Sequence, residues 1–204
     1  MSTADKNLGR VVTPEARLIY PHLFKPHQMT MNGKPKGDPR FEVELLFDPS
    51  SIDAMKQKAL AVARAKWPGR ELSQIRFPFK KGEAIKAKRE AKGKKGFDYY
   101  NGMISLRASS THKPKVVDHQ GEEILDEGRV YGGCYGYAEL NFVAWDGNGD
   151  NIPDCVTVYL NMVMKSRDGE RLGGGRNPKE VFSGVIGKDS QEDPTAGLDD
   201  ELPF

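Results

Sequence analysis

Two strand-like segments joined by a turn-rich loop place the strongest constraint on the fold of this chain. Residues 130–145 alternate between small or apolar side chains at even positions and aromatic or polar side chains at odd positions. This period of two is typical of a β-strand with one face toward a core. A second apolar segment covers 156–164, and the residues between the two include DGNGDNIPD, which is rich in hairpin-turn residues. The sequence therefore predicts a long β-hairpin.

One amphipathic helix is predicted before this hairpin, over 52–66. Its apolar residues recur on one face, Ser50 or Ser51 can cap its first turn, and Pro68-Gly69 ends it. Shorter strands are predicted at 11–20 with a break at Pro14, at 41–47 with one buried face, and at 75–79, 103–110 and 115–118. The remaining expectations are a loop over 21–39 and short helical turns at 83–92 and 178–186.

This order of elements predicts a mainly β protein with one substantial helix. We expect an OB-fold-like antiparallel β-barrel with enlarged loops, and an α+β sheet of another topology is the alternative. The expected domains are a flexible N-terminus over 1–10, an OB-fold-like domain that binds single-stranded DNA over 11–186, and a disordered acidic C-terminal tail over 187–204.

Charge is distributed unevenly along the chain. The total of 31 Lys and Arg against 29 Asp and Glu gives a net charge of only +2, but six of the acidic residues and no basic residue lie in 189–204. The chain before residue 189 therefore carries a net +8. Residues 80–95 concentrate that charge, with two acidic residues and eight basic ones: Lys80, Lys81, Lys86, Lys88, Arg89, Lys92, Lys94 and Lys95. Such a cluster is either a solvated surface segment or an arm that contacts phosphates.

Aromatic residues accompany the basic ones in two places. Phe97, Tyr99 and Tyr100 follow the basic segment directly, and Tyr131, Tyr135 and Tyr137 lie on the odd face of the predicted strand. Rings can stack on bases while cations follow the backbone, although tyrosines are also common cross-strand packing residues. Further candidate DNA contacts are Arg107 and the arginines Arg167, Arg171 and Arg176 of a glycine-rich segment, which alternatively forms a plain connection.

Several classes of protein are not supported by the sequence. We find neither a secretory signal nor the run of about 18 apolar residues that a membrane span needs. Cys134 and Cys155 lack metal-site spacing, and the chain contains no catalytic signature that we identify. DGNGDNIPD fails as a calcium loop, because Asn151 and Thr157 replace the required Gly and Glu. We therefore expect no cofactor, no metal, no enzymatic activity and a cytoplasmic location.

The chain ends in three acidic residues followed by Leu202-Pro203-Phe204. The tip, Asp199, Asp200, Glu201, Leu202, Pro203 and Phe204, has the chemistry of a docking peptide, with a ring and a carboxylate for a basic-rimmed pocket. DDELPF resembles the acidic tip of bacterial single-stranded DNA-binding proteins. Because the strand pattern continues to residue 164 and RDGERLGGGRNPKEVF follows, the whole chain is more similar to phage-encoded OB-fold proteins of this class.

This resemblance implies a non-catalytic protein that coats single-stranded DNA in phage replication or recombination, in the cytoplasm of a bacterial host. The tip would recruit replication proteins and compete with DNA for the basic groove, and self-association along DNA would be compatible with coating. Two alternatives remain at this point. One is an RNA-binding or duplex-binding accessory protein, and the other is a metal-dependent enzyme that uses Asp146, Asp150 and Asp154.

Overall fold

A computed structural model describes residues 7–31, 33–147 and 153–172. The chain divides into a unit over 1–172 and a unit over 173–204, and the described residues all belong to the first. The short helix predicted at 178–186, Arg176 and the acidic tail therefore lie outside the described residues.

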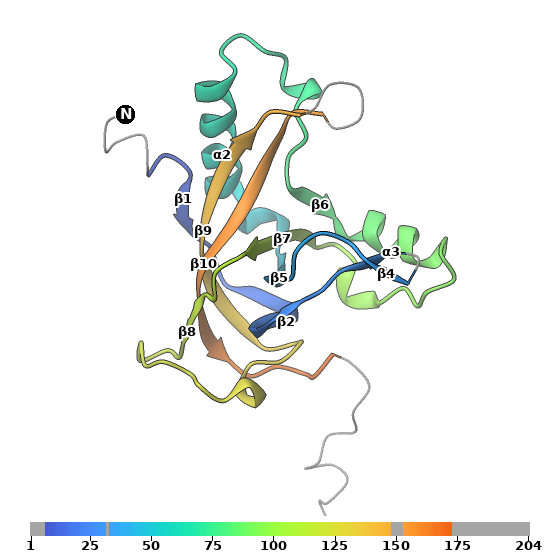
Figure 1. Cartoon of the computed structure of the whole chain (residues 1–204), viewed down its shortest axis with the longest axis vertical. Coiled ribbons are helices and arrows are strands. Elements are labelled where there is room, and N and C mark those ends of the chain that lie inside the picture. Colours follow the sequence, from blue (N-terminus) through green and yellow to red (C-terminus); the bar gives the residue numbers. More distant parts are fainter. Residues whose placement is uncertain (1–6, 32, 148–152, 173–204) are drawn as a thin grey trace, which may run out of the picture. The chain divides into compact units, whose positions relative to one another are not determined.

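Five strands close into a barrel, as the sequence predicts (Figure 1). In the order of their pairing they are β2 (Ala16–His27), β5 (Arg40–Phe47), β7 (Ile104–Ser110), β10 (Cys155–Arg167) and β9 (Tyr135–Trp145). The last of these, β9, pairs back with β2 and closes the ring. The pairings are antiparallel except for that between β7 and β10. This closed five-stranded barrel is OB-fold-like.

Shorter elements extend the barrel. The sheet continues through β1 (Arg10–Val12), β6 (Phe79–Lys81) and β8 (Lys115–Val117), and a separate small hairpin consists of β3 (Thr30–Met31) and β4 (Lys34–Pro35). The α-helices are α2 (Asp53–Lys66) and α3 (Gly82–Glu90). The 3-10 turns are η1 (Pro49–Ser51), η2 (Leu72–Gln74), η3 (Asp98–Tyr100) and η4 (Glu127–Arg129).

The hairpin of β9 and β10 confirms the strongest prediction from the sequence. At one end of the hairpin Trp145 pairs with Cys155, and at the other Tyr135 pairs with Arg167. The even positions from Gly136 to Phe142 are buried, as the alternation predicts. However, β9 begins at Tyr135 rather than at Val130. Gly133 has a φ of 113° and donates its N–H to the Leu18 carbonyl at 2.8 Å, so the chain turns before the strand begins.

The helix α2 contributes Met55, Ala59 and Ala63 to the same core as the barrel strands. Gly69, at a φ of 79°, follows its end as predicted. The predicted serine cap is wrong. Asp48 instead accepts the Ser50 N–H at 2.8 Å and caps η1, the 3-10 turn that leads into the helix.

The strand β5 has two buried faces, so the expectation of one buried face is wrong. Val43 and Leu45 face the barrel core, while Leu46 packs with Ile19 and Tyr100 in a second apolar cluster outside the barrel. Residues of α3 and η3 pack against this second cluster. Even Glu42 and Glu44 are only 8% and 7% exposed, because neighbouring segments cover the outer face of β5.

The strand β2 continues to His27, through residues that the sequence predicts as a loop. Its pairing with β5 is irregular, with register shifts between Ile19 and His22 and again between His22 and His27. These irregularities interrupt the period-2 pattern and explain why the sequence does not show a strand there.

Candidate nucleic-acid interface

The basic segment 80–95 comprises β6, α3 and the loop that follows. Lys80 and Lys81 lie on β6, which pairs with β7. The described structure leaves the side chains of six members of this segment exposed: Lys80, Lys81, Lys88, Lys92, Lys94 and Lys95. Lys86 and Arg89 are half-buried, and Lys86 forms an ion pair with Asp98 at 2.6 Å. The segment therefore presents most of its predicted charge to solvent.

The arm cluster, defined as Arg89, Lys95, Phe97, Tyr99 and Tyr100, adjoins this basic segment. The rings of Phe97 and Tyr99 are stacked with centroids 5.0 Å apart, and Tyr100 follows at 4.8 Å from Tyr99 in a tilted arrangement. The Arg89 guanidinium lies 4.9 Å from the Phe97 centroid, and the Lys95 ammonium lies 5.6 Å from it. The structure thus brings together the aromatic and basic residues that the sequence singles out here.

Tyr100 differs from the other rings because it is only 1% exposed. Its side chain packs against Ile19 and Leu46, and burial raises its pKa well above the usual range for a tyrosine. A ring enclosed in this way has no free face for a base. We therefore remove Tyr100 from the predicted contacts and assign it to the core that supports the cluster.

The hairpin cluster consists of Tyr131, Tyr135, Lys165, Arg167 and Arg171, at the end of the hairpin where β9 begins and β10 ends. The Arg167 guanidinium carbon lies 3.6 Å from the Tyr135 ring centroid, and that of Arg171 lies 3.8 Å from the Tyr131 centroid. The Lys165 ammonium approaches Tyr131 at 5.6 Å. Each half-buried tyrosine ring therefore has a guanidinium group packed closely over it.

Carboxylates hold the cations of the hairpin cluster in place. Glu15 accepts hydrogen bonds from Arg167 at 2.9 Å and from the Ser166 hydroxyl at 2.6 Å, and these bonds lower the pKa of Glu15. Asp168 accepts from Lys165 at 2.6 Å and from the Tyr131 hydroxyl at 2.9 Å, which lowers its pKa in the same way. Both carboxylates thus remain charged well below neutral pH and orient the cluster.

The backbone of residues 169–172 packs tightly beside the start of β9. The Leu172 N–H donates to the Gly132 carbonyl at 2.7 Å, and the Gly169 N–H donates to the Tyr131 hydroxyl at 3.2 Å. At Gly133, an added Cβ would overlap the carbonyl of Glu170. Glycine at this position therefore serves both the turn and the close approach that carries Arg171 over Tyr131.

Two further residues that the sequence predicts as DNA contacts, Arg107 and Tyr137, lie on barrel strands outside the two clusters. Arg107 is on β7, is exposed, and lies 3.7 Å from the Glu42 carboxylate. Tyr137 is half-buried on the outward face of β9, two residues after Tyr135. Arg176 and the tip residues 199–204 lie outside the described residues.

Two cations that the sequence does not single out, Arg17 and Lys165, belong to the same surface. Arg17 lies on β2 with its guanidinium 5.9 Å from the Tyr135 centroid, and its Nη2 donates to the Glu170 carbonyl at 3.2 Å. Its Nε is buried and has no acceptor among the described residues. The available signal was a cation at the edge of an apolar strand segment, since Arg17 directly precedes Leu18-Ile19-Tyr20 and Lys165 directly follows the apolar segment 156–164.

The acidic residues beside the hairpin turn engage cations of the chain itself. Asp146 pairs with Lys66 at 2.7 Å and accepts from the Trp67 indole at 3.0 Å, and Asp154 pairs with Arg70. Asp150 is outside the described residues. The two described aspartates therefore tie the hairpin to the end of α2, which argues against the metal-dependent reading of this loop.

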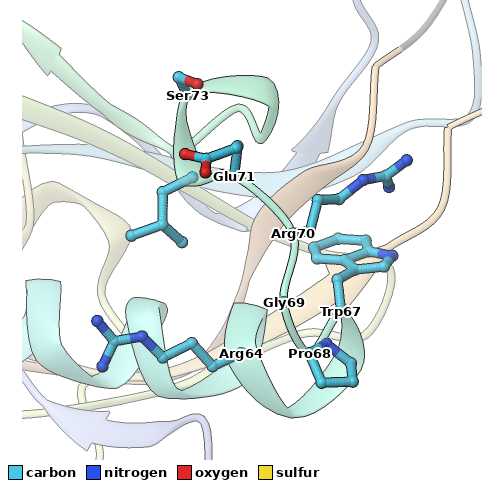
Figure 2. A pocket seen from close by; sticks show the side chains of 8 residues that line it. Arg64, Trp67, Pro68, Gly69, Arg70, Glu71 and Ser73 are labelled. Atoms are coloured by element: carbon cyan, nitrogen blue, oxygen red, sulfur yellow. The ribbon is translucent and has the colours of Figure 1, made fainter.

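A hollow of about 560 Å³ lies at this end of α2, lined among others by Arg64, Trp67, Arg70 and Leu72. Figure 2 shows the guanidinium groups of Arg64 and Arg70 on opposite sides of the hollow, and Arg70 beside the Trp67 ring. Because the two cations do not converge on one point, the hollow lacks the geometry of a compact anion site. We assign it no ligand.

His22, His27 and Glu42 form one group whose side-chain ligand atoms lie within 4.8 Å of one another. The histidine rings are stacked at 4.4 Å with an interplanar angle of 13°, and His27 Nδ1 lies 3.0 Å from the Glu42 carboxylate. The two rings are engaged in stacking, and the Glu42 carboxylate contacts both His27 and Arg107. We therefore assign no metal here.

The state of the cysteines and the character of the helices concern two expectations from the sequence, on metal ligation by cysteine and on membrane spans. Cys134 and Cys155 are free and buried, and burial raises the pKa of the Cys134 thiol, so this thiol is protonated at neutral pH. Within the described ranges, no helix is long and apolar enough to cross a membrane.

Comparison with known proteins identifies relatives. Protein p50 of Acyrthosiphon pisum secondary endosymbiont phage 1 is 27% identical over 190 residues, covering 86% of this chain and 94% of that protein. The single-stranded DNA-binding protein from bacteriophage Enc34, solved in complex with single-stranded DNA, matches 81% of this chain and 90% of its own with a TM-score of 0.63 and 20% identity.

The fold is also that of gp2.5, the single-stranded DNA-binding protein encoded by bacteriophage T7, with a TM-score of 0.52, 14% identity, and coverage of 90% of this chain and 98% of that one. These likenesses establish the fold. The family model of the Enterobacter phage Enc34 single-stranded DNA-binding protein matches residues 9–195, which is most of the chain. The chain therefore belongs to the Enc34 family of phage single-stranded DNA-binding proteins.

Proposed function

We propose that this protein binds single-stranded DNA without sequence preference and protects it during phage DNA replication or recombination. The observation that carries the proposal is the hairpin cluster, where guanidinium groups lie 3.6 and 3.8 Å from two tyrosine ring centroids on the barrel surface. A nucleotide offers the two groups that such a surface binds, a planar base for the ring and a phosphate for the cation. The family is one of DNA-binding proteins, in agreement with the expectation that the chain is not an enzyme.

The position of the arm cluster supports the same function. In OB-folds, ligands bind the face of the second and third barrel strands and the loops beside it. Here these strands are β5 and β7, Arg107 projects from the outer face of β7, and the arm cluster packs over the outer face of β5. Because rings and cations read neither base identity nor sequence, we expect similar affinity for different bases.

A titration of fluorescent oligo-dT at two salt concentrations tests the proposal. Since each neutralised phosphate releases counterions, log K should fall with log salt by about 0.7 per phosphate contacted. Competition with duplex DNA and with RNA of the same length completes the experiment. Salt-insensitive binding, or a preference for duplex or RNA over the single strand, would contradict the proposal.

We also propose that the acidic tip recruits replication proteins and competes with DNA for the basic surface. Residues 189–204 carry a net −6 against the +8 of the chain before them, which supports the competition on charge. Deletion of 189–204 should tighten DNA binding, and unchanged or weaker binding would refute the competition. Phe204→Ala keeps the side-chain charges and should impair only the capture of replication proteins, so an equal loss of DNA binding would refute a docking role.

A further inference from the structure

Tyr20 has a backbone conformation that its residue type disfavours. Its φ is 47°, and among the described residues no other non-glycine residue has a positive φ. Bulky side chains rarely adopt this left-handed region, and the following Pro21 further restricts the residue before it. A conformation of this kind persists only where the surrounding structure enforces it, and such residues concentrate at functional sites.

The strain at Tyr20 accompanies a bulge that turns its ring outward. Between Ile19 and His22 the register with β5 shifts, so that three steps along β2 match two along β5, from Glu44 to Glu42. Bulges of this kind redirect a side chain, and glycine commonly occupies the left-handed position in them. Ile19 is 1% exposed, whereas Tyr20 is 38% exposed. Burial of the Tyr20 ring therefore does not explain the strained conformation.

The position of Tyr20 suggests what the conformation achieves. On one side, Tyr20 neighbours Tyr99 of the arm cluster, whose pKa is raised well above the usual range of a tyrosine by burial and by the adjacent Tyr20. On the other, the Tyr20 backbone N lies within 3.8 Å of the point where a Cβ on Gly132 would sit, next to Tyr131 of the hairpin cluster. Tyr20 thus lies between the two groups of rings and cations.

We propose that Tyr20 stacks on an unpaired nucleobase and joins the arm cluster and the hairpin cluster into one continuous path for a single strand. The ligand class is a nucleobase of a single-stranded nucleic acid, and the inference rests on the DNA binding proposed above. The bulge places the Tyr20 backbone beside Gly132, next to the hairpin cluster, while its side chain neighbours Tyr99 of the arm cluster. Tyr20 is therefore a contact residue rather than a member of the core.

Three substitutions at this position separate stacking from structure. Tyr20→Gly and Tyr20→Ala both remove the ring, but only glycine accommodates the positive φ, so the glycine variant should have the higher melting temperature of the two. If the ring stacks on a base, both should lose affinity for oligo-dT by the same factor, about fivefold to 150-fold. Tyr20→Phe restores the ring and should recover most of this affinity.

An oligonucleotide with abasic sites supplies the second measurement, because it keeps the phosphates and removes the bases. The difference between wild type and Tyr20→Gly should disappear on this probe if Tyr20 contacts a base. Leu125→Gly, at an 80% exposed apolar residue outside both clusters, is the control and should leave affinity unchanged.

The outcomes distinguish this inference from the function on which it rests. If wild type binds oligo-dT and Tyr20→Gly binds it equally well, the stacking role is refuted while DNA binding stands. Affinity losses that follow the melting temperatures of the two truncations, or that persist on the abasic probe, would also refute stacking. If wild type itself fails to bind single-stranded DNA, the proposed function fails.

Discussion

The arm cluster and the hairpin cluster contain the same kinds of side chain in different relations to the core. In the arm cluster the rings contact one another, and the series ends in the buried Tyr100. In the hairpin cluster each ring contacts cations instead of another ring, and contacts such as that between Glu15 and Arg167 hold these cations in place. The first cluster therefore continues the apolar cluster outside the barrel, and the second is an assembly of polar contacts on the barrel surface.

The two clusters therefore differ in whether they can exchange contacts without unfolding. A guanidinium that lies over a half-exposed ring can move toward a phosphate while a base takes its place on the ring. The interior rings of the arm cluster cannot be exchanged in this way, because removing them opens a cavity. We therefore expect substitutions at the interior rings of the arm cluster to affect both DNA binding and stability. Substitutions in the hairpin cluster should affect DNA binding with little effect on stability.

The largest expected effect comes from truncating one ring in each cluster. Tyr100→Ala should reduce the free energy of unfolding by about 3–5 kcal/mol, as for other buried aromatic residues, whereas Tyr135→Ala should reduce it much less. Tyr135→Ala should instead weaken oligo-dT binding by about 1–3 kcal/mol. Denaturant unfolding and fluorescence titration measure the two quantities. Equal destabilisation by both substitutions would show that the two clusters do not differ in their relation to the core.

A smaller effect concerns the salt dependence of binding. Replacing the exposed Lys88, Lys92 and Lys94 by Gln should lower the slope of log K against log salt by about 2, if each contacts a phosphate and contributes about 0.7. The matched control replaces Lys56, Lys58 and Arg64 of α2 by Gln and changes the net charge equally. If both triple variants lower the slope of log K against log salt by the same amount, the basic segment acts through total charge rather than through local contacts.

The smallest effect is the response of the hairpin cluster to acid. Because hydrogen bonds with Arg167 and Ser166 lower the pKa of Glu15 in the folded state, this carboxylate stabilises the fold above its unfolded pKa of about 4.5. That stabilisation is lost as the pH falls through the folded-state pKa. Glu15→Gln should therefore flatten the decline of melting temperature below about pH 5. A variant with the wild-type acid profile would show that Glu15 does not hold the cluster.

Much of the barrel could be predicted from the sequence because its strands alternate regularly. The even positions of β9 and the apolar face of α2 have the period of their elements, and both are buried as expected. The start of β9 and the extent of β2 could not be predicted. They depend on the packing of Gly133 against Glu170 and on bulges, which are contacts between residues distant in sequence.

The candidate site was predictable in its residue types and not in its geometry. The proximity of Lys95 to Phe97 in sequence predicts their contact, and the structure has it. The burial of Tyr100 depends on β2 and β5, and Lys165 reaches Tyr131 only because β9 and β10 pair. Nothing local to Tyr100 distinguishes it from Tyr99, so the pattern assigns both to the surface.

The closure of the barrel also has a consequence for the order of folding during synthesis. The strand β1 pairs with residues 139–141, β2 pairs with β9, and Glu15 reaches Arg167 across 152 positions. Contacts so distant in sequence slow folding, and a ribosome makes only about 5–20 residues per second. The N-terminal strands therefore wait several seconds for their partners, and the surface around Tyr131 and Tyr135 assembles only after Arg171 has emerged. A nascent chain thus cannot engage DNA through this surface before the barrel is complete.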